Sequence, residues 1–129
     1  MNNLKEAPAA FYQGIEEFNS RRFFECHETL EEIWNAEPSE LRRLYQGILQ
    51  IATAFYHATV RQNFRGATRL LETGMAWLEP FLPSTFGADL ADLVQNSAKA
   101  LHHIQTLGPA RMAEFDTSYI PQIRLVESK

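Results

Sequence analysis

The sequence contains a single cysteine, Cys26, among its 129 residues. One thiol cannot form an intramolecular disulfide or a zinc site built from several cysteines, so disulfide-stabilised and zinc-cysteine domains are excluded. The first ten residues, MNNLKEAPAA, also lack an apolar run of the length that signal peptides have. We therefore expect a cytoplasmic protein.

Long hydrophobic runs are absent as well. The longest stretch without a charged residue runs from Leu44 to Val60, and it contains two glutamines, a histidine and a glycine, which makes it a poor membrane span. Apolar residues make up 45% of the chain and charged residues 22%, a composition typical of a folded domain rather than of a disordered chain. We expect one domain over residues 1–129, with no membrane as its partner.

A sustained alternation of apolar and polar residues, which would mark strands, is also missing, whereas apolar residues recur at helical spacing almost throughout. This pattern predicts an all-α, single-domain bundle of about five helices. Two helical hairpins are expected within residues 8–82, followed by a C-terminal helix over 87–107 and an extended arm over 109–129. Pro38 ends the second helix, so an antiparallel third helix would place residue 27 level with residues 47–50.

The predicted second helix, over about 23–36, carries the first candidate for chemistry. Phe23, Cys26 and Leu30 form its apolar stripe, and His27 lies at the edge with Glu31 one turn later on the same side. A carboxylate four residues on can hydrogen-bond an imidazole, fix its orientation and raise its basicity. His27 and Glu31 are therefore the candidate catalytic or binding pair. The alternative is that Glu31 only satisfies a half-buried histidine.

The predicted third helix, over about 40–61, has no ordinary solvated face. Between Arg43 and Arg61 the side away from its apolar stripe offers neutral polar and small residues without any charge. A solvent-facing stripe of this length usually includes Lys or Glu, so we expect these groups to meet a polar partner surface, or to form a purely structural network. The candidate ligand-binding residues are Gln46, Gln50, His57 and Arg43.

Histidines and acids do not occur at the spacings of known metal sites. No histidine follows His27-Glu28 at position 31, which excludes a zincin site, and the paired Glu-x-x-His motifs of di-iron bundles are missing. His57 would lie roughly 10 to 14 Å along the third helix from the level of His27. No metal site is predicted, and no cofactor is indicated. Three other residues have reactive side chains. The thiol of Cys26 is expected to be small and buried, and the imidazoles of His102 and His103 are expected at the surface.

Charge is distributed unevenly along the chain. Residues 16–40 have a net charge of −6, whereas residues 41–69 contain five arginines and no acid. These surfaces can pair within the molecule or between subunits, and the arginines can bind phosphate or carboxylate groups. The overall charge of −4 and the lack of a basic tail or a known reading motif argue against a nucleic-acid partner.

Aromatic residues make up 12% of the chain, which is more large rings than a small bundle easily covers. Phe24 and Tyr12 lie off the apolar stripes of their predicted helices. A homodimer that shares such rings is one expectation. The alternative is a monomer in which the C-terminal arm covers the rings through Tyr119, Ile120 and Ile123.

The stretch Phe18–Trp34 resembles the signature of the domain of unknown function 309 family of bacteria and archaea. It contains a Phe-Asn pair, an aromatic pair, a glutamate, a small residue, His-Glu, Leu-Glu and a tryptophan in the family's order. The resemblance extends over residues 8–82, with a departure at Cys26, where alanine is usual. It implies a small, cytoplasmic, all-helical protein but no established activity. The family's characteristic positions are His27, Glu28, Glu31, Trp34, Gln46, Gly47 and Gln50.

Two functions are compatible with these residues. The first is a non-enzymatic module that binds a small molecule or a protein partner in a polar cleft. The second is a hydrolase-type enzyme, with or without a metal, that uses His27 as a general base oriented by Glu31. Such an enzyme needs a further electrophilic or nucleophilic group, and only the arginines are available. The cleft of the first hypothesis is lined by His27, Glu31, Gln46 and Gln50.

Overall fold

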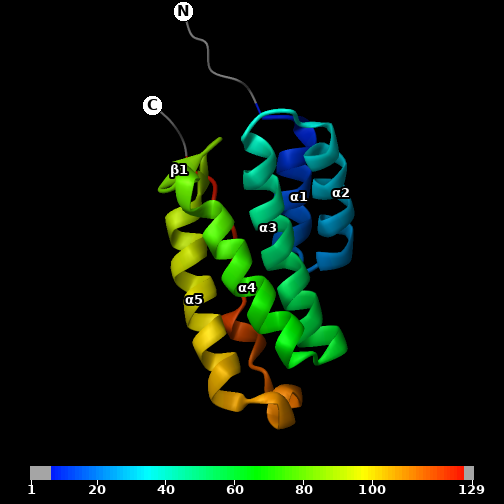
Figure 1. Cartoon of the computed structure of the whole chain (residues 1–129), viewed down its shortest axis with the longest axis vertical. Helices are drawn as coiled ribbons and strands as arrows, with labels where there is room; N and C mark the ends of the chain where they lie inside the picture. Colours follow the sequence, from blue (N-terminus) through cyan, green and yellow to red (C-terminus); the bar gives the residue numbers. More distant parts are fainter. Residues whose placement is uncertain (1–6, 127–129) are drawn as a thin grey trace, which may run out of the picture.

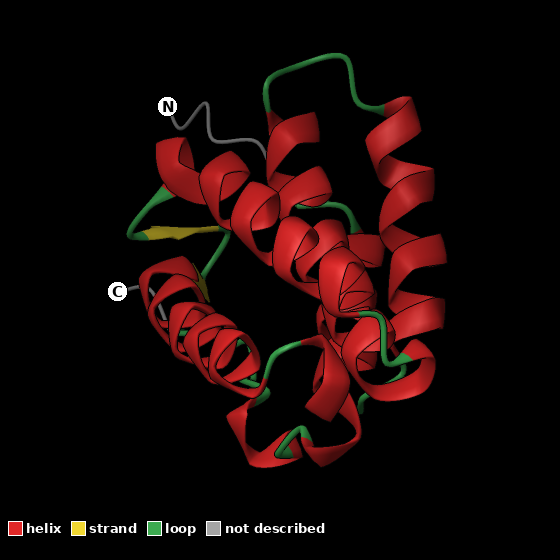
Figure 2. Cartoon of the chain, turned by 60° about the horizontal axis from the view of Figure 1, so that its bottom comes forward, coloured by secondary structure: helices red, strands yellow, loops and turns green. Residues whose placement is uncertain are grey.

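The computed structural model describes residues 7–126, and they are predominantly helical, which confirms the all-α fold (Figure 1). The short strands β1 (Ser84–Thr85) and β2 (Ala88–Asp89) form a small antiparallel pair, drawn in yellow in Figure 2. No helix in the described part of the chain has the length and hydropathy that a membrane crossing requires. The α-helices are α1 (Ala9–Asn19), α2 (Phe23–Ala36), α3 (Leu41–Tyr56), α4 (Phe64–Leu78) and α5 (Leu90–Leu107).

The third predicted helix differs from the expectation at its C-terminal end. It is α-helical only to Tyr56 and continues as the π-helical turn η1 (His57–Arg61). The hydroxyl of Thr59 donates to the carbonyl oxygen of Phe55 at 2.7 Å, so a side chain competes with the backbone for this acceptor. Gln62 then adopts a left-handed conformation, with φ of 49°, and ends the helix.

The chain after α5 corrects a second expectation. Residues 109–129 were expected to be extended, but the segment begins with the 3-10 helices η3 (Pro109–Glu114) and η4 (Thr117–Tyr119). Only the part from residue 120 onward is extended, and residues 127–129 lie outside the described range. The β1–β2 pair was not predicted because two-residue strands are too short to show alternation.

Helix α3 occupies the centre of the molecule. In Figure 1 it lies between α2 and α4, with α1 behind it and α5 on the far side of α4. Leu44, Ile48, Ile51 and Phe55 of α3 are completely buried in one continuous apolar core. Burying side chains of this size stabilises a fold by about 1.5–3 kcal/mol each.

The C-terminal segment packs against the end of α1 and covers that edge of the core. The side-chain amide of Asn19 donates to the carbonyl oxygen of Ile123 at 3.0 Å and accepts from its N–H at 2.7 Å. The guanidinium of Arg21 donates to the carbonyl oxygens of Ile120 and Pro121. These bonds hold the side chains of Ile120 and Ile123 in the core, where they are 6% and 2% exposed.

Two glycines allow α3 and α4 to approach closely. A Cβ atom at Gly74 would lie 2.9 Å from the carbonyl oxygen of Gly47 and 3.2 Å from the backbone nitrogen of Ile51. A Cβ atom at Gly47 would in turn meet the side chain of Leu78 at 2.7 Å. The separation of these two helices is therefore set by the absence of side chains at their crossing.

Replacing Gly74 by alanine is expected to lower the free energy of unfolding by about 1–3 kcal/mol, because backbone atoms of α3 must move. In an unobstructed helix the same change would raise the free energy of unfolding by about 1 kcal/mol. The sign of the measured change therefore shows whether α3 obstructs a side chain at this position. Gly14→Ala is the control and is expected to cost less, because its nearest neighbours would be side-chain atoms of Leu30, which can rotate. Urea denaturation measures both. A Gly74→Ala variant as stable as the wild type would contradict the close approach.

Candidate functional site

His27 is held by a threonine of the neighbouring helix. Its Nδ1 atom lies 3.1 Å from Oγ1 of Thr53 on α3, and Thr53 donates its own hydroxyl proton to the carbonyl oxygen of Leu49 at 2.9 Å. A hydroxyl whose proton is used in this way accepts from the imidazole, so Nδ1 carries the ring proton. In the neutral ring, Nε2 therefore keeps its lone pair, and the His27 side chain is 37% exposed.

Glu31 has a different role from the predicted one. Its Oε1 atom lies 3.7 Å from Nε2 of His27, which is beyond hydrogen-bond distance, and its side chain is 47% exposed. The partner that orients the imidazole is therefore Thr53. The neutral Nε2 atom and the Glu31 carboxylate are two hydrogen-bond acceptors side by side, which we call the acceptor pair. Protonation of Nε2 converts them into an ion pair.

The neutral polar residues of α3 form one line along the helix, the α3 stripe, which consists of Gln46, Gln50, Thr53 and His57. Its partners come from both flanking helices. Thr53 contacts His27 of α2, whereas Oε1 of Gln50 accepts a hydrogen bond of 2.6 Å from the hydroxyl of Thr73 on α4. Gln46 is half-buried, and no hydrogen bond of its side chain is found among residues 7–126. Gln50 therefore does not join His27.

The register between α2 and α3 explains this arrangement. Residue 27 was expected level with residues 47–50, but it lies level with Thr53, and the rings of Phe24 and Tyr56 meet with centroids 6.2 Å apart. Four residues, 37–40, connect α2 to α3, and the contacts of Thr53 and Tyr56 with α2 fix the register. His57 therefore follows the level of His27 by one turn, about 6 Å, which is less than expected.

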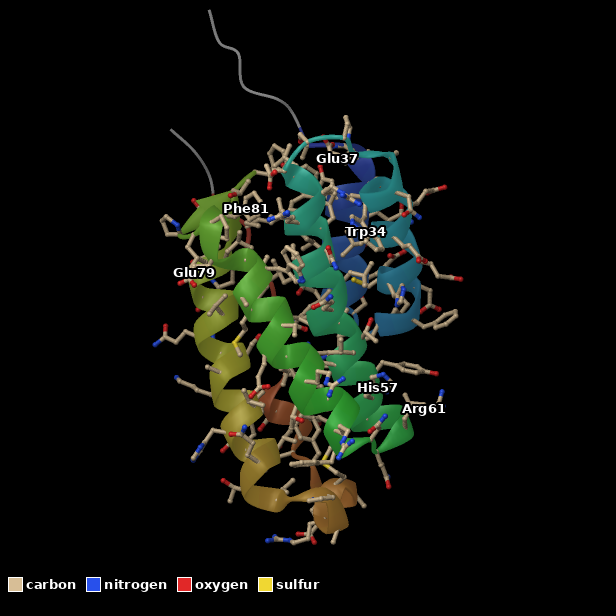
Figure 3. The ribbon with its side chains drawn as sticks, in the orientation of Figure 1. Trp34, Glu37, His57, Arg61, Glu79 and Phe81 are labelled. Atoms are coloured by element: carbon tan, nitrogen blue, oxygen red, sulfur yellow. The ribbon has the colours of Figure 1, made fainter. Side chains whose placement is uncertain are left out.

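His57 packs against the start of α4 near the lower end of α3, where Figure 3 labels it with Arg61. A Cβ atom at Gly66 would lie 3.1 Å from the imidazole ring, and the Nδ1 atom is buried without a partner among the described residues. Burial, with a smaller contribution from Arg61, lowers the pKa of His57. These contacts assign His57 a neutral, structural role between the two helices.

Arg43 lies near the opposite end of α3 from His57. Its guanidinium carbon is 5.1 Å from the centre of the Trp77 ring on α4, and its Nε atom is 3.4 Å from a carboxylate oxygen of Glu40. The ten residues from Arg43 to Thr53 correspond to about 15 Å of helix. Arg43 therefore ties α3 to α4 and does not reach the acceptor pair.

The remaining residues considered from the sequence are Cys26, His102 and His103. Cys26 is completely buried, as predicted, and burial, with a smaller contribution from Glu17, raises its pKa to about 12, so the thiol stays protonated at neutral pH. His103 was expected at the surface, but it is half-buried because its ring stacks on Tyr119 at 4.2 Å and its Nε2 atom accepts from the N–H of Asp116. His102 is exposed, as predicted.

Within the described residues no three acidic, histidine or cysteine side chains converge as metal ligands would.

Thr53 and Thr73 are the residues that sequence reasoning did not assign to particular partners. Thr53 belongs to the same uncharged line as Gln46 and Gln50, and this spacing was the signal that could have singled it out. Thr73 has no such signal, because its role depends on how α4 lies beside α3.

Comparison with known proteins finds one family model and one relative that match this part of the chain. A family model described as "Domain of unknown function (DUF309)" matches residues 11–70. The uncharacterized protein YpuF of Bacillus subtilis (strain 168) is 42% identical over 74 residues, which are 56% of this chain and 42% of that relative. The match thus spans less than half of the relative's length. Residues 11–70 contain the acceptor pair and the α3 stripe.

Replacing Thr53 by valine removes the hydroxyl that holds Nδ1–H of His27. The share of this tautomer is expected to fall because the acceptor that favours it is gone. The free energy of unfolding is expected to fall by about 0.5–1.5 kcal/mol. Ring nitrogen chemical shifts measure the tautomer, and urea denaturation measures the stability.

The control is Thr59→Val, because the Thr59 hydroxyl also donates to a carbonyl oxygen one turn back, and no histidine is bonded to it. This variant is expected to leave the His27 tautomer unchanged. If Thr53→Val also leaves the tautomer unchanged, another group orients His27.

His57 is expected to make stability depend on pH. Its pKa in the folded chain lies below the ordinary value of about 6.5, so the unfolded chain binds the proton more readily. The stability due to neutral His57 is therefore complete above about pH 6.5 and is lost as the pH falls from there through the folded pKa. Urea denaturation at about pH 5, 6, 7 and 8 should show a smaller loss for His57→Gln than for the wild type. The exposed His102→Gln is the control, and equal losses in all three proteins would refute the assignment.

Proposed function

We propose that this chain, whose residues 11–70 match the model of the domain of unknown function 309 family, is a non-enzymatic binding module whose ligand is received by His27 and Glu31. The observation that carries the proposal is the acceptor pair. Nε2 of His27 and Oε1 of Glu31 lie 3.7 Å apart, and both side chains are partly exposed. Both atoms offer lone pairs to the same space when the imidazole is neutral.

The chemistry of the pair defines the class of ligand. Two adjacent acceptors, one of them charged, are matched by a group that donates hydrogen bonds and carries positive charge. An ammonium or a guanidinium group has these properties, whether it belongs to a small molecule or to the side chain of a protein partner. The hydrogen bond from His27 to Thr53 supports such binding because it fixes the imidazole before the ligand arrives.

The surroundings of the pair favour binding over catalysis. The nearest hydroxyl, that of Thr53, already donates to Leu49 and accepts from Nδ1 of His27, so no base activates it as a nucleophile. The thiol of Cys26 stays protonated, because its pKa is raised to about 12.

One observation also supports the hydrolase alternative. The tautomer that Thr53 imposes leaves Nε2 of His27 able to take a proton from a water molecule, as a general base must. Glu31, at 3.7 Å, would then stabilise the imidazolium that forms. In this alternative Glu31 contributes charge, and Thr53 provides the orientation.

Titration with a guanidinium probe, L-arginine amide, tests the binding proposal. The ring signals of His27 are expected to shift in a saturable manner, and N-acetylglycine, an anionic probe, is expected to leave them unchanged. Glu31→Gln is expected to weaken binding of the probe by about tenfold or more, since a charge-assisted hydrogen bond contributes about 1.5–3 kcal/mol. The matched control is Glu32→Gln on the same helix. The absence of a saturable shift, or equal affinity in Glu31→Gln and wild type, would exclude the acceptor pair as a binding site.

Metal analysis separates the metal-free module from a metal-dependent enzyme. Protein purified without chelator is expected to contain no stoichiometric zinc, manganese or iron. Stoichiometric metal that is lost in His27→Ala but kept in His102→Ala would contradict the metal-free proposal.

A further inference from the structure

Among the described residues, the acids of α2 and the arginines of η1 and α4 form no ion pair with each other. The acids along the outer side of α2 are exposed, and so are Arg61 at the end of η1 and Arg65 and Arg69 on α4. The ion pairs of the described residues join His27 to Glu31, Arg43 to Glu40 and Arg111 to Glu114, so none connects the two groups. We call these groups the acidic face (Glu25, Glu28 and Glu32) and the arginine face (Arg61, Arg65 and Arg69).

An exposed apolar patch adjoins the first residue of each face. Phe24, in the first turn of α2, is 56% exposed, and Val60, in η1, is 62% exposed. Tyr56 is half-buried between them, since its ring contacts that of Phe24 and Val60 follows it by one turn. These three residues form the apolar patch. Large apolar side chains exposed together and rimmed by charge are typical of interaction surfaces.

The order of these surfaces makes them self-complementary. The acidic face follows Phe24 along α2, and the arginine face follows Val60, with Arg61 labelled beyond the lower end of α2 in Figure 3. A two-fold axis through the apolar patch therefore brings the patch of one copy onto that of the other. When the axis is oriented so that the acidic face of each copy meets the arginine face of its partner, opposite charges pair twice across the interface.

We propose that this surface binds a second copy of the same chain and forms a two-fold symmetric dimer. The presence of one acidic and one arginine face favours a second copy as the partner, because a protein with one sign of charge would match only one of the two faces. Three apolar side chains alone do not make a stable interface, which buries about 1,200–2,000 Å² in total. The two charged faces supply the additional contact surface.

Light scattering over a range of protein concentration and salt tests the dimer. The wild type is expected to have a mass near twice 14.8 kDa at low salt, and to dissociate toward 14.8 kDa when dilute or when the salt concentration is raised. Phe24→Glu is expected to raise the dissociation constant by at least about 30-fold, the loss expected for a residue central to an interface. The matched control is Leu125→Glu, since Leu125 is also exposed, at 54%, but lies outside the patch. Circular dichroism verifies that each variant keeps its helices.

Charge reversal tests the pairing of the two faces. Glu28→Arg and Arg61→Glu are each expected to weaken the dimer, and the double variant is expected to regain affinity because the opposite charges again face each other across the axis. A mass of 14.8 kDa at every concentration would overturn the proposal. So would a dimer that Phe24→Glu leaves intact, or a double variant no tighter than the single ones. None of these outcomes depends on ligand binding at His27.

Discussion

The burial of α3 is the constraint on which the rest of the structure depends. Its apolar side chains, among them Ile48 and Ile51, are excluded from water, and the glycines at the crossing bring α4 close enough to cover it. With α2 on the other flank, the part of α3 that follows Arg43 has room for polar residues along the α3 stripe. Half-buried polar groups need partners, and two members of the stripe find theirs on the flanking helices, Thr53 on α2 and Gln50 on α4. The polar contacts of the candidate site thus follow from how the core is packed.

Much of this fold was predictable from local pattern. The bounds of α2, the burial of Cys26 and the exposure of Phe24 follow from helical periodicity, and the structure confirms them. The register between α2 and α3 was predicted wrongly, because it is set by the connection between them and by contacts such as Phe24 with Tyr56. The orienting partner of His27 depends on this register. Sequence reasoning therefore placed His27 and Glu31 side by side on one helix but assigned the orienting role to Glu31.

Helix α2 presents different chemistry in each direction. One side buries Cys26 and Leu30 in the core, the edge carries the acceptor pair, and the outer side carries the acidic face. Because the side chains of a helix at three- and four-residue spacing share a direction, a short sequence can serve all these purposes at once. Each residue type in this helix is thus tied to a particular direction.

The bonds between the end of α1 and the C-terminal segment have a consequence for synthesis on the ribosome. Asn19 and Ile123 are separated by 104 positions, so the carbonyl and N–H groups that satisfy the Asn19 amide are made long after α1 itself. During translation the helical hairpin of α1 and α2 can form, but the edge of the core that Ile120 and Ile123 cover stays open to water. A nascent chain that stalls before residue 120 therefore exposes an apolar seam of the kind that chaperones and proteases recognise. Closure of this edge of the core therefore waits until residues 120–123 have been made.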